Sequence, residues 1–177
     1  MNPGTLGALV ATLLLLSAPV RASDSVGGAM DDSATTASVK AALFNSSRTH
    51  AGDIHVQTYG SIVQLSGFVR SQEEKDAAES LAAGVASVKR VINSLAVGQE
   101  GSVGEQLDDS VTTSRVKAAL IDTAGVNGRQ IEVETQRGVV QLSGFVASDD
   151  ERNRAAKVAA GVDSVKSVEN VLQLRPK

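Results

Sequence analysis

Val-Gln-Leu-Ser-Gly-Phe-Val at residues 63–69 occurs again, unchanged, at residues 140–146. The match extends in both directions from this stretch, so that residues 31–97 align with residues 108–174 without a gap. Of the 67 aligned positions, 33 carry the same residue. A match of this length at a constant offset of 77 is an internal duplication, so the chain contains two copies of one structural unit.

The apolar residues of the repeated stretch alternate, which predicts a strand with one buried face. The same period occurs in residues 54–58, and residues 88–97 are expected to form the last strand of the unit. Before the first strand, Val39, Ala42 and Leu43 fall on one face at helical spacing, and Asp32 or Ser33 is the expected cap of that helix. Each unit is therefore predicted to contain, in this order, a helix, two strands, a second helix and a third strand.

The second helix of each unit begins with a capping box, in which a serine hydroxyl and a glutamate three residues later satisfy the first free N–H groups. These boxes are Ser71-Gln72-Glu73-Glu74 and Ser148-Asp149-Asp150-Glu151. The helix from about Gln72 is expected to end at Gly84, in the left-handed conformation that glycine favours.

The first two strands of each unit are joined by a tight turn, at Tyr59-Gly60 in the first copy and at Arg137-Gly138 in the second. These turn glycines differ in register by one position, which predicts two different turn types. Gly67 and Gly144 within the second strand predict a bulge or a close approach of a helix to the sheet.

The expected fold is α+β, with two tandem α-β-β-α-β units that each form a three-stranded mixed sheet with two helices on one face. We assign residues 31–97 to the first domain and residues 108–174 to the second. Residues 98–107 contain three glycines and predict a flexible linker, and residues 23–30 predict a second linker before the first domain.

Two helices cover only one face of such a sheet, so the other face is expected to be open. Ile54, Val56, Val63, Leu65, Val69, Val91, Leu95 and Val97 are predicted to point to the core. Asn93 and Asn170 lie on the same side, where a buried amide is expected to bond a loop backbone. A phenylalanine on a bare sheet face suggests docking, either between the units or with a partner. The candidate interaction surface consists of Ile62, Phe68, Ile92 and Phe145.

Residues 1–22 are expected to be a signal peptide, because an apolar run at residues 6–16 precedes the small-x-Ala pattern Val20-Arg21-Ala22. A run of 11 residues is shorter than the roughly 20 that span a bilayer as a helix. The sequence therefore predicts export across a membrane without a transmembrane anchor in the mature chain.

The composition excludes several classes of protein. Hydrophobic residues make up 42% and charged residues 21% of the chain, as in folded proteins, but aromatic residues reach only 2%. The absence of cysteine excludes thiol catalysis, disulfides, thiolate metal sites and a lipidated N-terminal cysteine. The net charge of −3 offers no basic field for nucleic acid.

The chain carries no recognisable catalytic motif, so we expect neither an enzyme nor a cofactor. His50 and His55 are the two histidines, and His55 with Asp53 gives only two ligands, fewer than zinc requires. Ser66 and Ser143 precede glycines, but no nucleophile-elbow pattern surrounds them, and we interpret them as strand serines.

The repeated pattern resembles the BON domain, named for bacterial outer-membrane and nodulation proteins. The resemblance rests on Leu-Ser-Gly-x-Val in the second strand and Gly-Val-x-Ser-Val before the third, and it covers residues 31–97 and 108–174. It implies an envelope protein linked to osmotic or envelope stress, with no catalytic residues. We expect a periplasmic, chaperone-like module that binds envelope proteins, or alternatively a module that associates with phospholipid surfaces and supports outer-membrane integrity.

The lipid alternative depends on basic residues near the membrane surface, each of which contributes about 1 kcal/mol. The second unit offers Arg115, Lys117 and Arg129 as candidate lipid contacts. The acidic residues around them would repel an anionic surface, so the predicted patch is weak.

Overall fold

A computed structural model describes residues 24–98 and 101–176 of the chain. The expected signal peptide, residues 1–22, lies outside the described residues. Within the two described ranges, no helix combines the length and the apolar character needed to cross a membrane.

The first unit begins with helix α1 (Asp24–Phe44), which a short 3-10 turn, η1 (Ala51–Asp53), connects to the sheet. Strands β1 (Ile54–Tyr59) and β2 (Ile62–Val69) form an antiparallel hairpin. Helix α2 (Gln72–Ala83) then crosses back, and β3 (Arg90–Val97) pairs with β2 in parallel.

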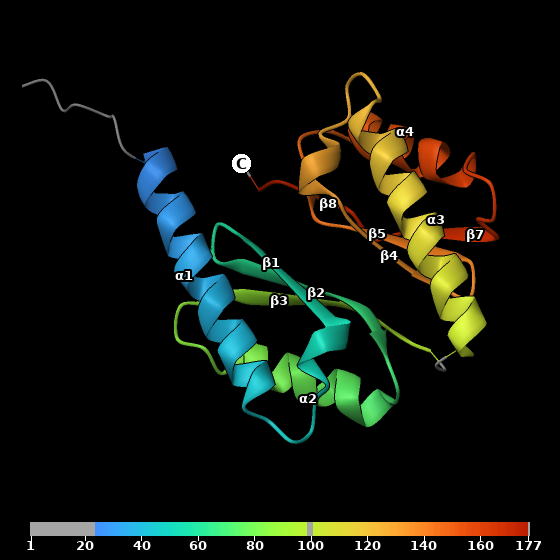
Figure 1. The fold of residues 1–177 in the computed structure, drawn as a ribbon. Coiled ribbons are helices and arrows are strands. Elements are labelled where there is room, and N and C mark those ends of the chain that lie inside the picture. The colour runs from blue at the N-terminus through green and yellow to red at the C-terminus, as the bar shows by residue number, and fades with distance from the viewer. Residues whose placement is uncertain (1–23, 99–100, 177) are drawn as a thin grey trace, which may run out of the picture.

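The second unit repeats this order with α3 (Val103–Ile121), η2 (Gly128–Gln130), β4 (Glu132–Gln136), β5 (Val139–Ser143), β6 (Phe145–Val146), α4 (Asp149–Ala160), β7 (Ser167–Asn170) and β8 (Gln173–Leu174). Its strand pairing is split, because β5 pairs with β4 and β7 while the short β6 pairs with β8. The α+β fold with two α-β-β-α-β units and mixed three-stranded sheets is confirmed (Figure 1).

Each unit has its own aliphatic core between its helices and the inner face of its sheet. In the first unit, α1 contributes Val39 and Leu43, which pack with the inward-facing residues of β1 and β2. The second core repeats these positions with Val116 and Leu120 of α3. Val97, which was predicted to point to the core, is 53% exposed because it lies at the end of β3.

The expected linkers are shorter than predicted, because helix occupies parts of both. α1 already begins at Asp24, so residues 24–30 are helical. α3 begins at Val103, where Ser102 and Glu105 form a capping box, so residues 103–107 belong to the helix.

Asp32 and Ser33 do not cap α1, since both lie within it. The Ser33 hydroxyl bonds back to the carbonyl of Ala29, and the Asp32 carboxylate accepts the N–H groups of Gly60 and Ser61. Asp109 holds the second hairpin turn in the same way. The aspartate therefore ties the first helix of each unit to its hairpin.

The two hairpin turns have the same form, so the prediction of different types is wrong. Gly60 and Ser61 in the first copy, and Arg137 and Gly138 in the second, all have positive φ. Positive φ at both central residues is the pattern of a type I′ turn, which matches the twist of the strands. A glycine in only one of the two central positions is sufficient for this turn type, since Ser61 and Arg137 adopt positive φ at the other central position.

The serine half of each predicted capping box is confirmed, but Glu74 and Glu151 do not bond the N–H groups of the cap serines and accept those of Arg70 and Ala147 instead. Ser71 and Ser148 accept the N–H groups of Glu74 and Glu151. The helices end at glycines, but Gly84 has φ −74° in the ordinary right-handed region, so the left-handed cap was wrong. Its N–H continues the helical pattern by donating to the carbonyl of Ser80.

Candidate functional site

The two sheets face each other, and the helices lie on the outside of the molecule (Figure 1). The open sheet face of one unit is therefore covered by the open sheet face of the other. At the centre of this contact the hydroxyl oxygens of Ser66 and Ser143 lie 2.7 Å apart, and both residues are buried. These serines are 77 positions apart, so equivalent positions of the two copies meet.

Two buried glutamines join the sheets in a reciprocal way. The side-chain oxygen of Gln141 accepts the N–H of Gly67 at 2.7 Å, and that of Gln64 accepts the N–H of Gly144 at 2.9 Å. Their amide nitrogens also cross the interface, since Gln64 donates to the carbonyl of Val171 and Gln141 to that of Ser94. Because Val171 is the counterpart of Ser94, the contact has approximate twofold symmetry.

Gly67 and Gly144 are special because a side chain would fit neither position. Their φ values are +114° and +123°, and a Cβ on Gly67 would overlap the carbonyl oxygen of Asp53. The predicted close approach is made by the short 3-10 elements before the hairpins, through the carbonyls of Asp53 and Gln130, and at Gly144 also by the side chain of Gln57.

The predicted interaction residues are only partly accessible. Phe145 is 6% exposed, and its ring lies 5.7 Å from the ring of Tyr59 in the first unit. Ile62, Phe68 and Ile92 are half-buried. The structure thus places Phe145 between the units, and binding of an outside partner through these four residues stays a prediction.

A histidine–glutamate hydrogen bond joins the units at the edge of the contact, and it becomes an ion pair when the histidine is protonated. His55 Nε2 lies 3.1 Å from Glu134 Oε2. This hydrogen bond raises the pKa of His55 above its ordinary value, while partial burial of the ring opposes the shift and Glu132 adds to it. Protonation of His55 therefore strengthens the contact between the units.

The junction also contains a cavity of about 600 Å³, whose lining includes Phe68 and His55 from the first unit and Asp109 and Glu134 from the second. Among the described residues, no group of three or more His, Asp and Glu side chains is arranged to hold a metal ion. His50, the other histidine, bonds to the buried Glu74 through Nδ1 at 3.0 Å.

Asn93 and Asn170 fix helices to the sheets, whereas loop contacts were expected. Their side-chain amides donate to the carbonyls of Lys75 in α2 and Arg152 in α4. These bonds position the second helix of each unit over the last strand.

The three candidate lipid contacts differ in their surroundings. Arg115 and Arg129 are exposed, whereas the ammonium of Lys117 pairs with Glu132 at 2.8 Å. The N-terminal half of α3 also carries Glu105, and Asp108 and Asp109 follow one turn later. Their role in lipid binding stays a prediction.

The outer faces of α1 and α3 carry a feature that our sequence reasoning missed. On α1, exposed apolar residues follow one another every three or four positions, and on α3 the same spacing is interrupted once, by the exposed Ser114. On each helix these residues lie within a sector of about 80°. The exposed residues are Met30, Ala34, Ala37, Ala41 and Phe44 on α1, and Val103, Leu107, Val111, Ala118 and Ile121 on α3. We call these two rows the outer stripes. Their periodicity was visible in the sequence, but the core-facing period of the same helices was the one we interpreted.

Comparison with known proteins agrees with this architecture. The family model of the BON domain matches residues 31–99 and 108–176. The osmotically-inducible protein Y of Escherichia coli K12 is 46% identical over 152 residues, which cover 85% of this chain and 76% of that protein.

Two further similarities are more distant. The outer membrane lipoprotein DolP of Haemophilus influenzae is 30% identical, and the match covers 83% of this chain and 76% of that protein. Among solved structures, CdsD, a structural protein of the type III secretion system of Chlamydia trachomatis, matches with a TM-score of 0.35 and 15% identity, over 82% of this chain and 64% of that chain. Two matched domains and close relatives along most of their length show that this chain belongs to the BON domain family.

Proposed function

We propose that this protein is a periplasmic, stress-related binding protein that holds apolar segments of unfolded envelope proteins along its outer stripes and catalyses no reaction. The periplasm and the link to osmotic stress are inferred from the osmotically-inducible relative and from the expected signal peptide.

The observation that carries this proposal is the repetition of the outer stripe in both copies. Phe44 is 80% exposed and Met30 70%, and their counterparts Ile121 and Leu107 are 49% and 65% exposed. The opposite faces of the same helices are buried in the cores, at Val39 and Val116. A surface helix normally has one apolar face, so a second apolar face on both helices indicates a surface that is used for binding.

The mutual docking of the sheets points to the same surface. Because the sheet faces are occupied by each other, an extended client segment has no access to them in the docked form. The helices lie on the outside, where a client reaches them without separating the units (Figure 1).

The negative charge of this chain favours an apolar protein segment over an anionic bilayer as the ligand of the outer stripes. The chain carries a net charge of −3, and Asp31, Asp108 and Asp122 are exposed residues of or beside the stripe helices. An anionic surface would be repelled by these carboxylates, whereas an apolar peptide segment carries no such charge.

The proposal is tested by the aggregation of a urea-unfolded outer-membrane β-barrel protein after dilution, followed by light scattering without lipid. We expect the protein to suppress aggregation, and the variants Met30→Ser/Phe44→Ser and Leu107→Ser/Val111→Ser to lose at least half of that effect. Ser38→Ala, at an exposed site outside the stripe, is the matched control.

A locked variant separates the helix faces from the sheet faces. The protein has no native cysteine, and the hydroxyls of Ser66 and Ser143 are in contact, so Ser66→Cys/Ser143→Cys is expected to form a disulfide across the interface. The oxidised variant should keep full activity. Loss of activity on oxidation, or full activity of both stripe variants, would contradict the proposal. Stripe variants that lose only binding to anionic vesicles would favour the lipid alternative.

A further inference from the structure

A cavity of about 510 Å³ lies beside the C-terminal end of α1. Leu43 and Ile54, which line it, are buried core residues, and the ring of Phe44 flanks it in an exposed position. Ala51 of η1 adds a further apolar surface. A cavity of this size is within the roughly 300–1,000 Å³ range of small-molecule sites, which are mostly apolar with a few placed polar groups.

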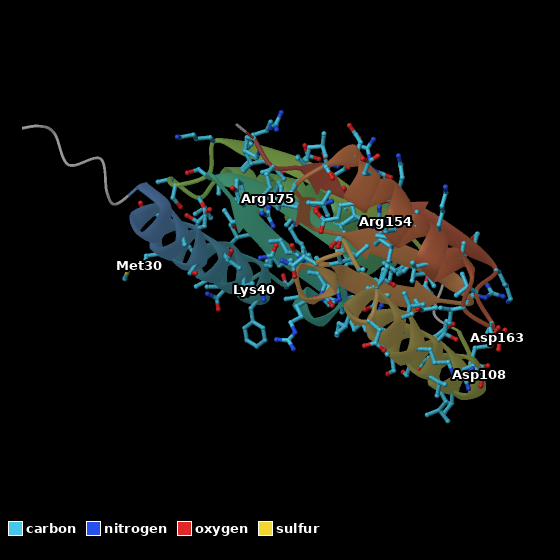
Figure 2. The ribbon with its side chains drawn as sticks, turned by 90° about the horizontal axis from the view of Figure 1, so that it is seen from above. Met30, Lys40, Asp108, Arg154, Asp163 and Arg175 are labelled. Atoms are coloured by element: carbon cyan, nitrogen blue, oxygen red, sulfur yellow. The ribbon has the colours of Figure 1, made fainter. Side chains whose placement is uncertain are left out.

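The lining of this cavity carries a positive charge and no negative charge among the described residues. Lys40 is the single lining residue with a permanent charge, and no carboxylate is among the described residues that line the cavity. Lys40 is exposed on α1, where Figure 2 labels it, and has no hydrogen bond or ion pair with any residue in the described ranges. The cavity therefore combines an apolar interior with an ammonium group that has no counter-charge.

The equivalent lysine of the second copy has different surroundings. There Lys117, the counterpart of Lys40, pairs with Glu132 at 2.8 Å. In the first copy the position of Glu132 is occupied by His55, which bonds instead to Glu134 across the unit interface. Of the two equivalent lysines, one therefore has an internal partner and the other has none among the described residues.

We propose that this cavity binds a single-chain anionic amphiphile of the fatty-acid class. The alkyl chain covers Leu43, Phe44 and Ile54, and the carboxylate accepts a charge-assisted hydrogen bond from the ammonium of Lys40. The cavity shares Ala41 and Phe44 with the outer stripe of α1. The two activities are distinguished by Lys40, which lies outside the stripe and is unchanged in the stripe variants.

The probe is decanoate, kept below the concentration at which it forms micelles, and decanol is its uncharged counterpart. Binding to the protein is measured by isothermal titration calorimetry at constant pH. We expect one decanoate per chain and at least about tenfold weaker binding of decanol, since the charged hydrogen bond is lost. Lys40→Gln should weaken decanoate binding by a similar factor.

Lys117→Gln is the matched control, because it removes the same charge at the equivalent position of the other copy. It should leave decanoate binding unchanged. Equal affinity for decanoate and decanol, equal effects of the two lysine variants, or no saturable decanoate binding would each overturn the assignment. The Lys40 and Lys117 side chains are outside the cores, so both variants are expected to fold, as circular dichroism would verify.

Discussion

Glu74 and Glu151 are buried carboxylates near the start of the second helix of each unit. The two oxygens of Glu74 accept the N–H groups of His50 and Arg70, and Glu151 accepts those of Asn127 and Ala147. Each glutamate thus joins the loop before the hairpin to the entry of the helix. Burial opposes the ionisation of Glu74, but these N–H groups and the His50 ring together hold its pKa below the ordinary value.

Replacing Glu74 by alanine leaves two backbone N–H groups without acceptors. Glu74→Ala is therefore expected to lower the free energy of unfolding by about 2–4 kcal/mol, measured by urea denaturation at pH 7. The exposed neighbour provides the control, since Glu73→Gln removes only a solvent-exposed charge at the start of α2 and should lower the urea midpoint far less. Equal effects of the two variants would show that the N–H contacts of Glu74 contribute nothing.

His55 makes the contact between the units sensitive to pH. The charged groups that act on it are Glu134, Glu132 and Lys117, and the net effect is a raised pKa. A raised pKa in the folded state means that the stabilisation is fully present below the unfolded pKa of about 6.5 and is lost as the pH rises through the folded pKa.

We therefore expect the protein to lose stability above about pH 6.5, by no more than about 1 kcal/mol because the pair is partly exposed. Urea denaturation of the wild type and of His55→Gln, at steps between about pH 5.5 and 8.5, measures this. The pH-dependent component should be absent in the variant. An unchanged pH profile in His55→Gln would show that another group titrates.

The residue roles were only partly predictable from the sequence. The serine caps of α2 and α4 follow from a local pattern, and the structure confirms them. Asp32 shares the residue types of a cap but instead binds a hairpin turn 28 residues away, and such a tertiary contact leaves no local signal.

At the level of the elements, strand β2 depends on Gly67. Its φ of +114° is a region that side-chain-bearing residues rarely adopt, and the carbonyl of Asp53 occupies the space of a Cβ. Gly104 is a useful comparison, because it lies in helix α3 and a methyl group added there would meet nothing within 4 Å.

Gly67→Ala is expected to destabilise the protein by about 2 kcal/mol or more, since backbone strain and the overlap add together. Gly104→Ala should instead stabilise it by about 0.5–1 kcal/mol, because alanine favours the helix. Thermal unfolding of the two variants measures both effects. A melting temperature of Gly67→Ala at or above the wild-type value would contradict the conformation assigned to this strand.

The order of elements was predictable because the periodicity of the core residues decides it. The N-terminal ends of α1 and α3 were not predictable in this way. Glycines at residues 27, 28 and 104 suggested linkers, yet helix extends over all three. A single helical glycine costs only about 1 kcal/mol, and the rest of a long helix compensates for that cost.

At the level of the whole molecule, the duplication was evident from the sequence, but the partner of the open sheet faces was not. The alternation of apolar and polar residues shows that a strand has a second face, but it does not show which part of the molecule covers that face. By alternation Gln64 and Gln141 lie on the sheet face opposite the core, and both are buried there because the other unit covers that face and each bonds one of its backbone N–H groups. The docked sheets leave the helices on the outside of the molecule (Figure 1).

Amide hydrogen exchange at Gly67 and Gly144, followed by NMR in the full chain, tests the docking of the two sheets most directly. Both N–H groups donate to a glutamine of the other unit, so docking should protect them as strongly as the amides of their own strands. Rapid exchange at both glycines, with the amide of Leu65 still protected, would mean that the units fold separately and do not dock.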